Sequence, residues 1–239
     1  MSKEIIKSGK NTDEIFREKS LKGNMLMLII YTGMPLAIYQ GLSQLFKIFD
    51  TMMAAHISAQ SVSAVAYLSQ LIALLSAVAG GISVSTGIQV SRAFGEGDYE
   101  MVKKRVSTMY FISVIFAILM LIIILPLTIP FLKLAATPDE LIETGASYFM
   151  IEMFTMAVSF VNNIYIVIER SRGRTDRILW LNILVLISKL GLTALFVYIL
   201  KGGLHMIAIA TLLSQIILLL FAIYNSVIKE RLRDRKSVV

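Results

Sequence analysis

Six long apolar stretches alternate with short polar connections along this chain. A transmembrane helix needs about 20 mostly apolar residues to cross a hydrocarbon core of about 30 Å, and every stretch is long enough. The pattern therefore predicts an all-α polytopic membrane protein, a bundle of six transmembrane helices. The predicted spans are residues 25–49, 62–90, 106–131, 146–168, 178–200 and 206–228.

These six spans fill residues 25–228 and leave only a polar tail at 1–24 and a basic tail at 229–239. No room remains for a soluble catalytic domain, so we expect any function to lie among the helices. The first 24 residues lack a short apolar core before a small-residue cleavage site, so we expect no cleaved signal peptide.

Proline and glycine mark the places where the predicted helices should weaken or end. Pro35 in the first span has no N–H to donate, and this predicts a loosened or bent helix. Pro126 and Pro130 should loosen the outer end of the third span. After the second span, Gly95 and Gly97 should break the helix and Asp98 should cap the next one.

Basic residues lie almost entirely on one side of the predicted membrane, and this sets the orientation. Of the 23 Lys and Arg residues, nineteen lie in the two tails and the even-numbered connections, while three (Lys47, Lys133 and Lys201) lie opposite. The nineteen are Lys3, Lys7, Lys10, Arg17, Lys19, Lys22, Arg92, Lys103, Lys104, Arg105, Arg170, Arg172, Arg174, Arg177, Lys229, Arg231, Arg233, Arg235 and Lys236. The positive-inside rule then predicts that both termini are cytoplasmic.

Composition narrows the function classes further. The net charge of +7 could suggest nucleic acid, but the basic clusters carry almost none of the interleaved aromatic residues that such binding uses. The chain has no cysteine, which excludes disulfides, thiolate metal sites and a cysteine nucleophile. Because the spans hold no histidine cluster, paired aspartate motif or nucleophile with a base, we expect neither an enzyme nor a cofactor.

Ionisable side chains at membrane depth are the candidate functional residues. An ionisable group at a helix centre costs about 2.5–3.5 kcal/mol on insertion scales, so each calls for a partner, a cavity or a function. Lys189 lies about 16 Å from the cytoplasmic edge of its span, and Glu152 lies about 24 Å from the inner end of its own. Two interpretations stay open: the two charges flank a wet cavity, or they form a buried pair between the fourth and fifth spans. The adjacent amides Asn162 and Asn163 also lie at this depth.

Asp50 follows the polar second half of the first span, where Gln40 and Gln44 should face a protein interior or a cavity. In a straight helix Asp50 would lie about 37 Å from Met25, which is near the outer interface. It is then either an exposed loop carboxylate or, if the helix tilts or bends at Pro35, a group inside the bundle.

Several motifs follow one another along the chain in a fixed order. The first stretch is FDTMMAAHISAQSVSAVAYLSQLIALLSAVAGGISVSTGIQVSRAFGEGD, which contains Asp50 and the closing Gly-x-Gly-Asp at 95–98. Tyr148, the Arg-x-x-Gly turn at 170–173, and AIATLLSQ at 208–215 come after it. In order and spacing these motifs resemble the MATE family of multidrug and toxic compound extrusion transporters.

This resemblance implies two six-helix bundles around a central cavity, of which this chain supplies the first. It implies a multi-pass protein of the plasma (inner) membrane that exports cationic or amphiphilic small molecules in exchange for H+ or Na+. Asp50 corresponds to the family's first-helix aspartate in the cation site. Many family members known for proton coupling carry a second aspartate in the fifth helix, where this chain has Lys189, Thr193 and Ala194.

The candidate cation- or substrate-binding residues are therefore Asp50, Gln40, Gln44, Tyr148, Glu152 and Lys189. The expected partners are the lipid bilayer, a small-molecule substrate, a coupling cation, and a second six-helix half or another copy of the chain, with no nucleic acid. Two other functions remain open: a flippase for lipid-linked sugars, whose cavity should carry several cationic residues for phosphates, and a truncated, non-transporting membrane subunit.

Overall fold

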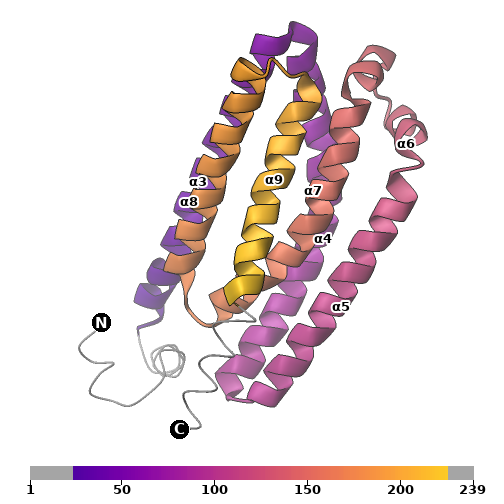
Figure 1. Ribbon diagram of the computed structural model, residues 1–239. Helices are drawn as coiled ribbons and strands as arrows, with labels where there is room; N and C mark the ends of the chain where they lie inside the picture. The colour runs from indigo at the N-terminus through magenta and orange to yellow at the C-terminus, as the bar shows by residue number, and fades with distance from the viewer. Residues whose placement is uncertain (1–23, 226–239) are drawn as a thin grey trace.

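The computed structural model describes residues 24–225, and all of its regular elements are helices (Figure 1). The helices are α3 (Met25–Ile57), α4 (Ala59–Glu96), α5 (Tyr99–Ile124), α6 (Thr128–Leu134), α7 (Asp139–Ser171), α8 (Thr175–Ala194) with a short π-helical continuation η1 (Leu195–Ile199), and α9 (Leu204–Ile223). Apart from residue 24, the predicted tails at 1–24 and 229–239 lie outside the described residues. The all-α prediction is confirmed for residues 24–225.

The six long helices run up and down, so that the start of α3 and the end of α9 lie at the same end of the bundle (Figure 1). Helix α7 packs against α4, α5 and α9, while α3 packs against α8 and α4. The connections α4–α5 and α7–α8 lie at the end that holds the start of α3. This is the arrangement that an even number of spans requires.

Within the part of the chain that the structure describes, five helices are long and apolar enough to cross a membrane: α4, α5, α7, α8 with η1, and α9. Helix α3 is the sixth long helix, and it lies alongside α8 over much of its 33 residues (Figure 1). Large apolar side chains are exposed on these helices; Trp180 is 70% exposed and Ile199 is 72% exposed. Such a surface suits a lipid environment rather than water.

The helices extend beyond the predicted spans at most ends. Helix α3 continues through Asp50 to Ile57, eight residues past the predicted end of the first span. In contrast, the third predicted span is interrupted: α5 ends at Ile124 and the short helix α6 begins at Thr128. Pro126 lies in this interruption, where its missing N–H and its restricted φ disfavour helix.

Local capping explains two of the tight connections. Ser58 separates α3 from α4, and its hydroxyl accepts a hydrogen bond from the Ser61 N–H at 3.0 Å. Gly97 ends α4 with a φ of 79°, a left-handed conformation that favours glycine. The Asp98 carboxylate then accepts from the Met101 N–H at 2.9 Å and caps α5. The predicted helix end at Gly97 and the predicted cap at Asp98 are confirmed. The predicted break at Gly95 is wrong, because α4 continues through Gly95 to Glu96.

The main core lies where α7 crosses α4. Phe149 and Met153 on α7 and Leu68 on α4 are each 0% exposed. Gly145 permits this close approach, because a Cβ built on it would lie 2.4 Å from Leu68 Cδ1 and 3.5 Å from the Ala64 Cβ. Close packing of this kind holds α7 in the middle of the bundle, where it carries the buried polar groups described next.

Candidate functional site

Asp50 and Lys189 form an ion pair between α3 and α8. The Lys189 Nζ lies 2.5 Å from the Asp50 Oδ2, and the two side chains are 17% and 13% exposed. Lys189 lies fourteen residues after Thr175, about 21 Å along α8, and Asp50 lies inside α3 rather than in a loop. The interpretation of Asp50 as an exposed loop carboxylate is therefore wrong, because α3 continues two turns beyond it.

Glu152 lies on α7 and is only 8% exposed. It interacts electrostatically with both Lys189 and Asp50, and its side chain lies close to Thr211 on α9. Within residues 24–225 no Lys, Arg or His nitrogen comes within 4.0 Å of its carboxyl group, and Lys189 pairs with Asp50 instead. The alternative of a direct Glu152–Lys189 pair that holds the fourth and fifth spans together is therefore wrong in this conformation.

Tyr148 lies one turn before Glu152 on α7 and is 6% exposed. Its hydroxyl lies close to Ser69 on α4 and interacts electrostatically with Glu152 and Asp50. Four of the six candidate residues, namely Asp50, Tyr148, Glu152 and Lys189, are thus brought together from three helices. They form what we call the buried charge cluster.

Gln40 and Gln44 lie apart from this cluster. Both side chains are exposed on α3, and they share a helical stripe with Lys47, which is exposed as well. Gln40 precedes Asp50 by ten residues, about 15 Å along the helix. The described residues therefore leave a polar stripe on the outer surface of α3.

Polar residues that the sequence did not single out lie on α9. The Nδ2 of Asn162 donates to the Gln215 main-chain O at 2.9 Å and to its Oε1 at 3.0 Å, joining α7 to α9. Thr211 lies one turn from Gln215 and contacts Glu152. The signal was present, because Thr211 and Gln215 are four residues apart and share one face of an otherwise very apolar helix.

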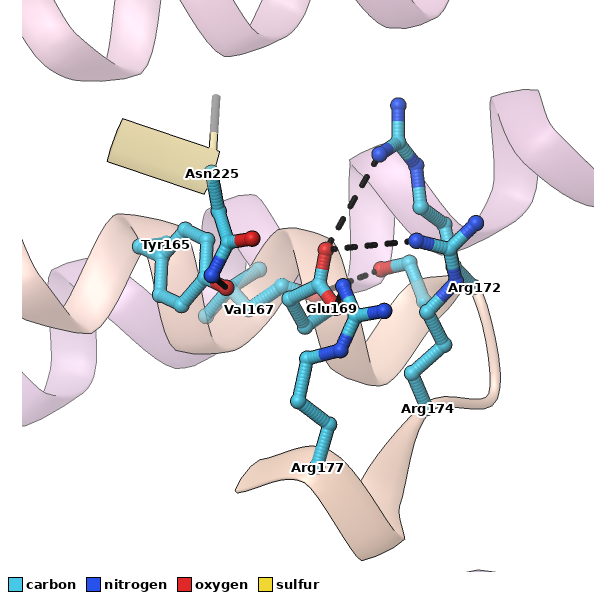
Figure 2. A network of polar contacts seen from close by, with 8 residues as sticks. Tyr165, Val167, Glu169, Arg172, Arg174, Arg177 and Asn225 are labelled. Atoms are coloured by element: carbon cyan, nitrogen blue, oxygen red, sulfur yellow. Dashed lines mark hydrogen bonds and ion pairs between the residues drawn. The ribbon is translucent and has the colours of Figure 1, made fainter. Parts of the chain in front are cut away.

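A second polar network surrounds Glu169 at the α7–α8 turn (Figure 2). Glu169, whose side chain is 4% exposed, lies 3.0 Å from Arg177 and 3.9 Å from each of Arg172 and Arg174. Gly173, with a φ of 72°, reverses the chain so that the arginines converge on this carboxylate. Three residues of the predicted cytoplasmic cluster therefore also fix the geometry of the turn.

The bundle holds two carboxyl groups in different surroundings. Asp50 is paired with Lys189, whereas Glu152 is buried close to the Thr211 hydroxyl. Among residues 24–225, no group of three or more His, Cys, Asp or Glu side chains is arranged to hold a metal ion. A carboxylate paired with a lysine can exchange that partner for another cation, or can lose its charge by taking up a proton.

Comparison with known proteins places this arrangement in context. The family model described as MatE matches residues 35–195, a stretch that contains the whole buried charge cluster. No curated protein sequence matches the chain.

Several solved structures share the fold. An outward-facing multidrug resistance MATE family transporter of the MOP superfamily aligns at 22% identity with a TM-score of 0.83, covering 92% of this chain and 48% of that one. A MOP superfamily transporter from Pyrococcus furiosus, whose reversed binding-pocket polarity is said to suggest a different function, aligns at 23% identity and 0.82, covering 88% and 47%. A MATE protein in complex with MaD3S aligns at 23% identity and 0.81, covering 89% and 48%. The chain therefore spans about half the length of these transporters.

Proposed function

The chain belongs to the MatE family, and from that premise we propose that it forms one half of a cation-coupled antiporter that exports cationic or amphiphilic small molecules. The coupling ion is H+ or Na+, and the protein works in the plasma (inner) membrane with both termini in the cytoplasm. Asp50 carries the exchange site.

The observation that supports this role is the pairing of Asp50 with one lysine at membrane depth. A buried ion pair contributes little net stability, because the cost of removing two charges from water offsets their attraction. Such a pair is therefore a better candidate for function than for structural support. An incoming cation can replace the lysine on Asp50, and protonation of Asp50 would release that cation.

The polar stripe of α3 supports the proposal that the chain works with a second half. Gln40, Gln44 and Lys47 are exposed on the described bundle, and uncovered polar groups in hydrocarbon are costly. A second six-helix bundle, encoded separately or supplied by another copy of this chain, would cover the stripe and enclose a cavity. Alternating access in such transporters uses two repeats around a shared site.

A flippase for lipid-linked sugars is the weaker candidate. A cavity for phosphates needs several cationic groups, whereas the buried charge cluster has one lysine and two carboxyl groups, and that lysine faces Asp50. A truncated, non-transporting subunit would need none of these groups.

Efflux of the fluorescent cation ethidium from cells that express the chain with its second half tests the proposal. Asp50→Asn should abolish efflux per molecule of protein in the membrane. Asp98→Asn is the matched control, because asparagine caps α5 as well as aspartate does, and it should leave efflux unchanged. Efflux that persists in Asp50→Asn at the rate of the control would refute the role of Asp50.

A further inference from the structure

The buried charge cluster holds one cation and two carboxyl groups. Lys189 contacts Asp50 at 2.5 Å, while Glu152 interacts with both of them without an ion pair of its own among residues 24–225. If both carboxyl groups were ionised, the cluster would carry a net negative charge in a site of low dielectric constant. A proton on Glu152 would remove that charge.

The burial of Glu152 supports a proton on it. Glu152 is 8% exposed, and no Lys, Arg or His nitrogen among residues 24–225 lies within 4.0 Å of its carboxyl group, because Lys189 pairs with Asp50. A buried charge without an ion-pair partner is costly, whereas a protonated carboxyl group carries no charge.

Building on the proposed function, we propose that Lys189 is a tethered counter-ion, which moves from Asp50 to Glu152 when a cation binds Asp50. In exchange, Glu152 releases its proton to the water on one side of the membrane. The binding cation forms an ion pair with Asp50 and breaks the Asp50–Lys189 pair. The O–H bond of Glu152 breaks, the proton leaves to water, and the new carboxylate pairs with Lys189. One positive charge enters and one leaves, so the cluster stays neutral in both states.

This neutrality is the physical reason for the exchange. A cation that bound Asp50 while Glu152 kept its proton would leave Lys189 as an uncompensated charge at membrane depth, which is costly. Lysine suits the movement, because its ammonium group sits on a flexible four-carbon stem and has no fixed bonding plane.

The groups that face Glu152 come from each helix around it. They are Asp50 on α3, Lys189 on α8, Thr211 on α9 and Tyr148 on α7 itself, whose hydroxyl lies close to Ser69 on α4. The two charged groups in this set are Asp50 and Lys189. Release of a proton from Lys189 instead would persist in Glu152→Gln, so that variant identifies the group that loses the proton.

Calorimetric titration of the purified full-length chain in lipid nanodiscs with tetraphenylphosphonium tests the exchange. This cation has no ionisable proton, so comparing its binding heat in phosphate and in Tris buffer counts the protons that the protein releases. We expect about one proton per bound cation, by proton linkage. Glu152→Gln should bind the cation more weakly, because Lys189 then has no second carboxylate to pair with, and the residual binding should release no proton. The exposed-carboxyl control Glu140→Gln should release as many protons as the wild type.

Infrared difference spectroscopy of the wild-type chain gives a second measurement that needs no variant. Binding of tetraphenylphosphonium should remove the carbonyl stretch of a protonated carboxylic acid. Binding without proton release, or release that persists in Glu152→Gln, would overturn the exchange while leaving Asp50 as a cation site. If Asp50→Asn binds the probe as well as the wild type does, or if the wild type does not bind it, the proposed function also fails.

Discussion

The Nζ of Lys189 lies 2.5 Å from the Oδ2 of Asp50, although 139 residues separate them in the chain. The contact joins α3 to α8 at membrane depth and gives the lysine a counter-ion, without which its burial would be costly. It also means that a cation cannot reach Asp50 without displacing Lys189. One contact therefore links the stability of the bundle to the occupancy of its candidate site.

Breaking this pair on one side should destabilise the protein more than removing both charges. Lys189→Gln leaves the Asp50 carboxylate without its partner, and the loss of one partner from a buried pair costs about 3–5 kcal/mol. The double variant Asp50→Asn/Lys189→Gln should recover most of that loss. Thermal unfolding in detergent micelles measures the difference. Equal stability of the single and double variants would contradict the pairing.

The close approach of α4 and α7 predicts a specific sensitivity at Gly145. Gly145→Ala would place a Cβ 2.4 Å from Leu68 Cδ1, and Leu68 is fully buried and has little space to move. Overpacking of this kind costs about 1–3 kcal/mol. Gly81→Ala is the control, because nothing lies within 4 Å of a Cβ built there. Unfolding at the same temperature in both variants would show that α4 and α7 do not pack this closely.

The α7–α8 turn should depend on the Glu169 carboxylate. Glu169→Gln removes the charge that holds Arg172, Arg174 and Arg177, so trypsin should cleave this turn several-fold faster in inside-out vesicles. Glu96→Gln is the control: the Glu96–Arg92 pair is exposed, at 56% and 77%, and exposed pairs contribute little. If cleavage of Glu169→Gln is no faster than that of the control, the network does not order the turn.

The orientation can be tested directly, because the chain has no cysteine. Leu134→Cys introduces a thiol at an 86% exposed position at the predicted outer end, and Tyr99→Cys introduces one at a 44% exposed position at the predicted cytoplasmic end. A membrane-impermeant maleimide applied to intact cells should label only Leu134→Cys. Labelling of Tyr99→Cys alone would reverse the predicted topology.

The number and type of the helices could be predicted from sequence, because span length is fixed by the bilayer. Their ends could not. Helix α3 continues past Asp50 to Ile57, beyond the predicted end at residue 49, because Met and Ala, which favour helix, fill positions 52–55. Short-range signals performed better: Gly97 and Asp98 end one helix and start the next as predicted.

The members of the site could be found from sequence more readily than their partners. Depth along a helix follows from the rise per residue, and this identified Lys189 and Glu152 as costly groups. Which carboxyl group pairs with Lys189 depends on how α3, α7 and α8 rotate about their axes, and packing rather than local sequence decides that rotation. For the same reason the contact between Glu152 and Thr211 was not predicted.

Uptake of ethidium into proteoliposomes that contain the chain with its second half tests the central proposal most directly. A pH gradient or a sodium gradient is imposed in separate experiments, and the gradient that drives uptake identifies the coupling ion. We predict gradient-driven accumulation by the wild type and none by the double variant Asp50→Asn/Lys189→Gln. Accumulation by that variant at the wild-type rate, or wild-type uptake that neither gradient affects, would contradict a cation-coupled exchange site at Asp50.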